Sequence, residues 1–332
     1  MRAIVYYRYG SPEVLQLAEV ARPEPREDEL LIRVKAVEVT KADCEMRSFR
    51  FAVNWFWLPL RLALGIRRPR KPILGAYFAG EVAATAAENS RFKPGDAVFG
   101  ATQMRLGAYA EYLAVPEHYT LVPKPPQVSF AAAAAVPLGG LNALHFLNLA
   151  GLRSGEDLLI IGAGGSIGLL ATQIAKARGA RVTAVDKTSK EAVVLQAGAD
   201  VFVDYTRQDP GRLSDRFDVV FSMVAGGSYR MALGLLKPTG RYLMGNPRLS
   251  DMVRSFLTGW FSSRKAYFAF ASESLAELEE LAAMLESGEL RPLVDRTFTM
   301  DQAAEAHTWV ESEKRNGSIV LEMANDETAR AD

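Results

Sequence analysis

Residues 158–168 read LLIIGAGGSIG, an apolar run that passes directly into a glycine-rich loop. Four apolar residues in succession predict a buried strand, and Ile167–Arg178 reads as a helix. A loop in this position exposes backbone N–H groups at the positive end of the helix dipole, which favours a pyrophosphate. The stretch therefore predicts a dinucleotide-binding site. Its glycines, Gly162, Gly165 and Gly168, depart from the strict G-x-G-x-x-G spacing, and a tight turn that binds nothing is the alternative.

An acidic residue follows at the distance that this site requires. The next expected strand, Arg181–Val185, ends beside Asp186, eighteen residues past the loop. A carboxylate there accepts hydrogen bonds from the adenosine ribose and repels a 2′-phosphate, which favours NAD(H). A 2′-phosphate could instead be reached by nearby residues in the sequence, namely Lys187, Lys190 and Tyr205, which leaves NADP(H) as the alternative. A second alternative is that Asp186 only caps the next helix. The cofactor-binding candidates in this region are Gly162, Gly164, Gly165, Ser166, Ile167, Gly168, Asp186, Lys187, Lys190, Tyr205, Val224 and Gly245.

The pattern of the chain changes on either side of the loop. Residues 1–125 consist of short apolar or alternating runs separated by turn signals, which predicts β-structure, and the proline-rich 122–126 reads as a boundary. Residues 126–270 alternate strands with helices, which predicts βαβ units and a parallel sheet. Residues 271–332 return to α+β character, with a helix expected between an N-cap at Ser274 and a stop at Gly288. We therefore expect an α/β protein in three segments.

Composition narrows the class of protein. Of the 332 residues, 39 are Lys or Arg and 39 are Asp or Glu, and this balance argues against a nucleic-acid partner. The single cysteine, Cys44, excludes a disulfide framework and any site built from several cysteines. Residues 51–66 are too short for a membrane span, and 128–152 are weakly apolar and broken by Gly and Pro. We expect a soluble, cytoplasmic protein.

Further stretches resemble the medium-chain dehydrogenase/reductase superfamily, in particular its zinc-free quinone oxidoreductase-like branch. The resemblance implies a GroES-like β-rich catalytic domain made from both ends of the chain, with a Rossmann doubly wound parallel sheet domain inserted in it. It also implies a homodimer joined at the edges of the Rossmann sheets through residues 266–271, for which a solvated edge strand is the alternative. The stretches that carry it are MRAIVYYRYGSPEVLQL at the start, VTKADCEMRSF (39–49), PILGAYFAGEV (72–82), RFKPGDAVFG (91–100), GAYAEYLAVPE (107–117), AAAVPLGGLNALHFL (133–147), AGADVFVDY (197–205) and LKPTGRYL (236–243).

The same resemblance argues against zinc. Zinc-dependent relatives carry a cysteine at the position of Thr40, a His-Glu pair at Ala76–Tyr77 and a four-cysteine lobe that this chain lacks. The three histidines have no ligand spacing. Cys44 is either a reactive thiol near the cleft or, as we expect, a buried spectator.

Without zinc, other groups must act on the substrate. The resemblance places Thr40, Asp43 and Arg47 in the segment that lines the cleft. Tyr77 replaces an acid, and its phenol would either donate a proton or fill the pocket. Asn142 replaces a threonine beside the nicotinamide and joins the cofactor candidates. The catalytic candidates are thus Thr40, Asp43, Arg47 and Tyr77, with a structural role as the alternative for each.

The segment 51–71, FAVNWFWLPLRLALGIRRPRK, combines aromatic bulk with basic residues at Arg61, Arg67, Arg68, Arg70 and Lys71. We rank three roles for it: the wall of an apolar substrate pocket, then a solvated loop, and last a membrane contact.

These observations predict a zinc-independent NAD(P)H oxidoreductase that reduces a quinone or an α,β-unsaturated carbonyl compound, with a small lipophilic substrate. The alternatives are a zinc-free alcohol or carbonyl dehydrogenase, and a nucleotide-binding protein without catalysis that associates with a membrane or a partner.

Overall fold

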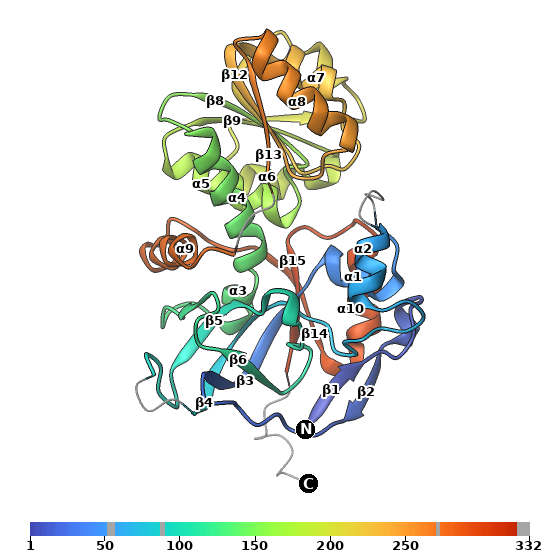
Figure 1. Cartoon of the computed structure of the whole chain (residues 1–332). Helices are drawn as coiled ribbons and strands as arrows, with labels where there is room; N and C mark the ends of the chain where they lie inside the picture. Colours follow the sequence, from blue (N-terminus) through green and yellow to red (C-terminus); the bar gives the residue numbers. More distant parts are fainter. Residues whose placement is uncertain (52–56, 87–89, 270–272, 324–332) are drawn as a thin grey trace.

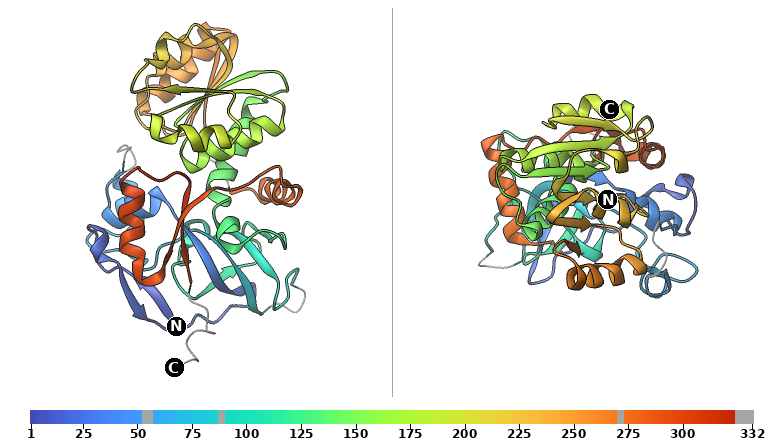
Figure 2. Two further views of the ribbon diagram at one scale, coloured as in Figure 1. Left: turned by 180° about the vertical axis from the view of Figure 1, so that it is seen from behind. Right: turned by 90° about the horizontal axis from the view of Figure 1, so that it is seen from above.

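The computed structural model describes residues 1–51, 57–86, 90–269 and 273–323. Its strands form two large sheets, one above the other in Figure 1, and a small pair formed by β1 and β2. The lower sheet combines the two ends of the chain, because β15 pairs antiparallel with β3 (Figure 2). The strand order across this lower sheet is β14-β15-β3-β4-β5-β7, and β6 also pairs with β3. The small pair consists of β1 (Arg2–Val5) and β2 (Gln16–Glu19). The strands of the lower sheet are β3 (Glu29–Val39), β4 (Tyr77–Thr85), β5 (Ala97–Ala101), β6 (Tyr112–Pro116), β7 (Leu121–Pro123), β14 (Val294–Thr299) and β15 (Ser318–Glu322).

The upper sheet is wholly parallel and has the order β10-β9-β8-β11-β12-β13. If these six strands are numbered 1 to 6 along the chain, beginning with β8, their order across the sheet is 3-2-1-4-5-6. This order defines the Rossmann doubly wound fold and confirms the predicted fold class. The order reverses between β8 and β11, where such sheets bind their ligands. The strands are β8 (Asp157–Ile161), β9 (Arg181–Asp186), β10 (Val201–Asp204), β11 (Phe217–Ser222), β12 (Leu236–Met244) and β13 (Lys265–Phe268). The expected domain limits at 125/126 and 270/271 stay predictions, and residues 270 and 271 lie outside the described residues.

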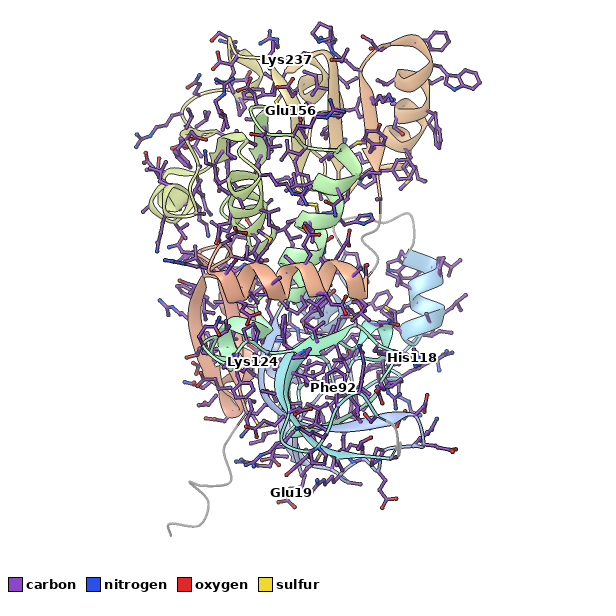
Figure 3. The ribbon with its side chains drawn as sticks, turned by 90° about the vertical axis from the view of Figure 1, so that its left-hand side faces the viewer. Glu19, Phe92, His118, Lys124, Glu156 and Lys237 are labelled. Atoms are coloured by element: carbon purple, nitrogen blue, oxygen red, sulfur yellow. The ribbon has the colours of Figure 1, made fainter. Side chains whose placement is uncertain are left out.

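Helices flank both sheets. The predicted helix between Ser274 and Gly288 is confirmed as α9: the Ser274 hydroxyl accepts a hydrogen bond from the Glu277 N–H, and Gly288 ends the helix at φ +77°. Helix α9 packs against both α4 and β7 and lies between the two sheets (Figure 3). The helices are α1 (Lys41–Ser48), α2 (Trp57–Leu64), α3 (Phe130–Ala134), α4 (Pro137–Ala150), α5 (Ser166–Ala177), α6 (Glu191–Gln196), α7 (Tyr229–Gly234), α8 (Leu249–Phe261), α9 (Leu275–Ser287) and α10 (Ala303–Glu311).

One apolar core joins the two sheets. Phe99 and Val320 of the lower sheet belong to the same buried cluster as Leu158 and Ile160 of the upper sheet. Helix α4 supplies much of this cluster, so the apolar stretch at 128–152 contains a buried helix, as expected. In the described part of the chain, no helix is both long and apolar enough to cross a bilayer.

Candidate dinucleotide-binding site

The loop between β8 and α5 has the backbone of a phosphate cradle. Gly162 adopts φ +83°, a conformation that L side chains rarely take. A Cβ on Gly168 would lie 2.5 Å from the Gly162 carbonyl oxygen, so a glycine there lets α5 pack closely on the loop. Gly165 precedes α5, and no side chain caps that helix. The N–H groups of Ser166 and Ile167 in its first turn are therefore available to an anion.

The loop lies at the reversal point of the sheet. A Cβ on Gly162 would come within 2.8 Å of Val224 Cγ2, so the residues that follow β8 and β11 are in contact. Gly245 follows β12, and its N–H donates to the Ser222 carbonyl oxygen at 3.0 Å. The candidates Gly162, Val224 and Gly245 thus come from three neighbouring strand ends.

Asp186 is tied directly to the loop. Its Oδ2 accepts a hydrogen bond from the Gly164 N–H at 2.8 Å, and its Oδ1 accepts one from the Lys187 N–H at 2.8 Å. A Cβ on Gly164 would lie 2.8 Å from Lys190 Cβ, and the Tyr205 N–H donates to the Asp186 carbonyl oxygen at 3.2 Å. The structure therefore brings Asp186, the residue predicted to bind the adenosine ribose, together with Lys187, Lys190 and Tyr205, which were predicted to reach a 2′-phosphate.

The cations beside Asp186 differ in their surroundings. Lys190 is almost completely buried, and this burial lowers its pKa. The Lys187 ammonium reaches outward and donates to the Glu313 carbonyl oxygen at 3.2 Å. The positive charge of Arg315 also lowers the pKa of Lys190. Sequence analysis missed Arg315, because it comes from the far end of the chain and belongs to no motif.

Asn142 lies on α4, the helix that packs against α5. Its amide nitrogen donates to the Leu138 carbonyl oxygen at 2.8 Å, which leaves its amide oxygen and second N–H for other contacts. The same helix approaches the glycine loop at Gly139, where a Cβ would lie 3.0 Å from the Ser166 carbonyl oxygen.

Two of the catalytic candidates, Thr40 and Asp43, form the capping box of α1. The Asp43 carboxylate accepts from both the N–H and the hydroxyl of Thr40, at 2.9 and 2.6 Å, and from the Gly75 N–H at 3.1 Å. Asp43 is fully buried, and this burial raises its pKa. These contacts join α1 to the segment before β4 and favour the structural alternative for both residues.

Arg47 and Cys44 belong to a buried polar cluster between α1 and α10. Arg47 donates to the Gly10 carbonyl oxygen at 3.2 Å and forms an ion pair with Glu311. Cys44 Sγ lies 3.3 Å from His307 Nδ1. Burial raises the pKa of the Cys44 thiol and lowers that of His307 to about 3, so both are neutral at pH 7. Cys44 is buried, as expected.

Tyr77 faces a carboxyl group that sequence analysis did not consider. Its phenol interacts with the carboxyl group of Glu273, which immediately precedes the N-cap of α9. Burial raises the pKa of both groups, and one Glu273 oxygen is buried with no partner. The pair is a candidate proton source, and no local pattern could have connected residues so distant in sequence.

In the described ranges, no group of three or more His, Cys, Asp or Glu side chains could hold a metal ion.

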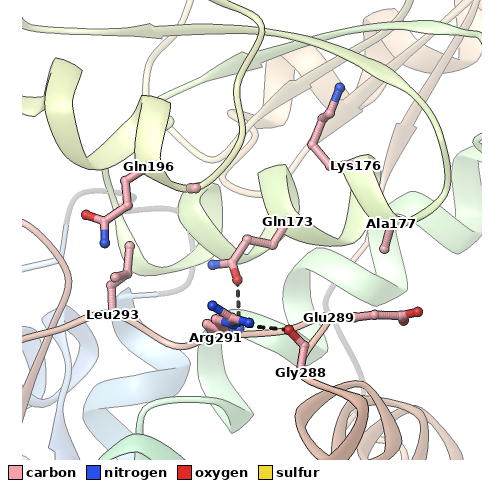
Figure 4. Close-up of a pocket in the computed structure, with 9 residues that line it drawn as sticks. Gln173, Lys176, Ala177, Gln196, Gly288, Glu289, Arg291 and Leu293 are labelled. Atoms are coloured by element: carbon pink, nitrogen blue, oxygen red, sulfur yellow. Dashed lines mark hydrogen bonds between the residues drawn. The ribbon is translucent and has the colours of Figure 1, made fainter.

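A cavity of about 350 Å³ lies between α5, the end of α6 and the turn after α9 (Figure 4). There the Arg291 N–H donates to the Gln173 side-chain oxygen at 2.7 Å. None of the candidate site residues lines this cavity.

A doubly wound sheet with a glycine loop, an uncapped helix and an acid at the second strand defines a dinucleotide-binding protein. Comparison with known families agrees. A model described as an alcohol dehydrogenase GroES-like domain matches residues 26–126, and one described as a zinc-binding dehydrogenase matches 197–321.

Individual relatives match along almost the whole chain. The quinone oxidoreductase of Lama guanicoe is 32% identical over 97% of this chain and 97% of its own. The 2-methylene-furan-3-one reductase of Solanum lycopersicum is 31% identical over 97% of this chain and 79% of its own. The structure of the quinone oxidoreductase from Coxiella burnetii superposes with a TM-score of 0.86 at 27% identity, covering 98% of this chain and 99% of that one. The chain belongs to the medium-chain dehydrogenase/reductase superfamily, in its quinone oxidoreductase-like branch.

Proposed function

We propose that the protein is a zinc-independent NAD(P)H oxidoreductase that reduces a quinone or the C=C bond of an α,β-unsaturated carbonyl compound. The observation that carries the proposal is the convergence of the glycine loop, Asp186 and Val224 at the reversal point of the sheet. The relatives named as quinone oxidoreductase and furanone reductase support the substrate class.

The chain supplies binding and positioning. The free N–H groups at the start of α5 hold the pyrophosphate, and Asp186 accepts hydrogen bonds from the adenosine ribose. A bound nicotinamide supplies the hydride. Asn142 offers a donor and an acceptor beside the ring. Tyr77, with Glu273 behind it, delivers a proton to the reduced substrate.

We favour NAD(H) over NADP(H), because the Asp186 carboxylate would repel a 2′-phosphate. Lys187, Lys190, Tyr205 and Arg315 are the groups that would hold that phosphate instead. A fluorescence titration with NADH and with NADPH, in the presence of EDTA, tests the proposal. Tighter NADH binding, followed by NADH oxidation with a quinone or an enone, is the expected result. Absence of binding by either nucleotide would contradict the proposed function.

The proposed enzyme is a homodimer joined at the edge strand β13. Helix α8 packs on this strand, and its apolar side chains are exposed, with Trp260 at 86% and Phe261 at 82%. A second copy would cover both the edge and these rings. Trp260→Ser combined with Phe261→Ser should shift the mass measured by light scattering toward the monomer. The control Leu195→Ser, on exposed α6, should leave the mass unchanged.

A further inference from the structure

The second exposed apolar surface of the described chain is centred on α2. This helix has no buried residue, and Leu58 and Leu62, one turn apart, are each more than half exposed. Ile66, just after the helix, and Met104, in the neighbouring loop, are exposed to a similar degree. Figure 1 shows α2 on the outside of the molecule, next to α1. The described part of the segment 51–71 therefore presents apolar side chains to solvent, and its predicted role as a pocket wall stays a prediction.

The same surface carries unpaired positive charge. Arg67, Arg68, Arg70 and Lys71 are all exposed, and in the described ranges no carboxylate pairs with any of them. No acidic residue occurs between Glu45 and Glu81, so the neighbouring sequence supplies no counter-charge either. Exposed cations without counter-charges repel one another, so a negatively charged partner would stabilise them.

Local structure holds these cations against the end of α2. The Tyr9 hydroxyl donates to the Leu64 and Gly65 carbonyl oxygens at 3.1 and 2.8 Å, and the Arg70 N–H donates to the Leu64 carbonyl oxygen at 2.8 Å. Gly65 adopts φ +122°, and a Cβ there would lie 2.1 Å from the Arg68 carbonyl oxygen. The tight turn thus fixes the basic run beside the exposed apolar residues.

Arg61 has a different role from the other cations. Its guanidinium lies 4.1 Å from the centre of the Phe49 ring and 4.7 Å from that of Tyr9. These cation–π contacts fasten the inner side of α2 to the protein. Leu58 and Leu62 lie beside this anchor on the helix and keep more than half of their surface exposed.

We propose that the α2 surface, consisting of Leu58, Leu62, Ile66 and Met104 with Arg67, Arg68, Arg70 and Lys71, docks on an anionic lipid bilayer. Exposed apolar residues flanked by unpaired cations are the features of an interfacial membrane contact. The apolar side chains enter the headgroup region, and the cations pair with lipid phosphates. This inference is independent of the proposed reaction and of the cofactor.

Vesicle sedimentation of the full chain tests the proposal. We expect binding to vesicles that contain phosphatidylglycerol, weak binding to pure phosphatidylcholine vesicles, and a loss of binding at high ionic strength. Replacing Arg67, Arg68, Arg70 and Lys71 together by Gln should weaken partitioning by up to about 1000-fold, since each cation near the surface contributes roughly 1 kcal/mol. Leu58→Ser with Leu62→Ser should leave binding that is weak and fully reversed by salt.

A matched control removes the same charge elsewhere. Four exposed arginines of the upper sheet region are replaced by Gln: Arg153, Arg212, Arg216 and Arg230. This variant should bind vesicles like the wild type. Equal loss in both variants, or retained binding in the α2 variant, would overturn the proposal. The proposal would also be overturned if, without vesicles, the wild type is a dimer and the α2 variant is a monomer. The α2 surface would then be a contact between two copies of the chain.

Discussion

The backbone N–H of Gly164 lies 2.8 Å from Oδ2 of Asp186, so the glycine loop and the acid at the end of β9 are directly hydrogen-bonded. The loop therefore fixes the position of the carboxylate that we propose as the ligand of the adenosine ribose. The negative charge of Asp186 also acts on the buried ammonium of Lys190, and we expect the balance between these charges to set the preference between NAD(H) and NADP(H).

Replacing Asp186 by Asn tests this balance. The variant loses the charge but keeps an acceptor for the Gly164 N–H, so we expect NADH affinity to fall about tenfold, as for one charge-assisted hydrogen bond. NADPH affinity should fall less or rise. Titration of both nucleotides gives the ratio, and Asp215→Asn, an exposed carboxylate of the same sheet region, is the control. An unchanged ratio would show that Asp186 does not select the cofactor.

The glycines of the loop are not equivalent. A methyl group at Gly168 would lie 2.5 Å from the Gly162 carbonyl oxygen, whereas one at Gly165 would lie 3.6 Å from the same atom. Gly168→Ala should therefore lower the free energy of unfolding by about 1–3 kcal/mol, the usual cost of overpacking. Gly165→Ala should leave it nearly unchanged. Equal unfolding midpoints for both variants in urea would contradict this assignment.

Tyr77 and Glu273 should act together on turnover. If the pair delivers the proton, Tyr77→Phe and Glu273→Gln each lower kcat by about 100-fold, the lower range for general acid catalysis, with little change in KM. The solvent deuterium isotope effect on kcat should change with them. Tyr119→Phe, a half-buried tyrosine of the same region, serves as the control. Normal kcat in both variants would leave the pair a packing contact.

Glu38 makes stability depend on pH. Both of its carboxyl oxygens are buried without a partner, and burial raises its pKa from 4.5 to about 8, against smaller opposite effects of Ser318 and Arg315. The folded state then holds a proton that the unfolded state has released. Stability from this group is complete below pH 4.5 and is lost as the pH rises to about 8. The slope for one proton is about 1.4 kcal/mol per pH unit.

Glu38→Gln should remove this dependence and raise the melting temperature at alkaline pH relative to the wild type. Thermal unfolding followed by circular dichroism at several pH values measures the difference. A parallel pH profile for the two proteins would mean that Glu38 is ionised in the folded state.

Several features could be predicted from sequence because they depend on neighbouring residues. The strand, glycine loop and helix at 158–178 follow one another in the chain, and α9 is bounded by its own N-cap and glycine. The capping box of Thr40 and Asp43 is equally local, since its two residues are three apart, although the resemblance implied a place in the cleft for both. The fold class was therefore accessible, and the structural use of these two residues could have been found.

Other relationships depend on how the sheets are assembled. Parallel pairing of β11 beside β8 brings Val224 to Gly162, and the return of the C-terminal segment brings Glu273 to Tyr77 and Arg315 to Lys190. The exposure of α2 has the same origin, since only packing decides which apolar residues are covered. Local turns, helix caps and the succession of strands along the chain follow from the sequence, because hydrogen bonds across a few residues depend on local backbone preferences. The tertiary structure alone decided which distant side chains meet, because sheet register and packing, not separation along the chain, set those distances.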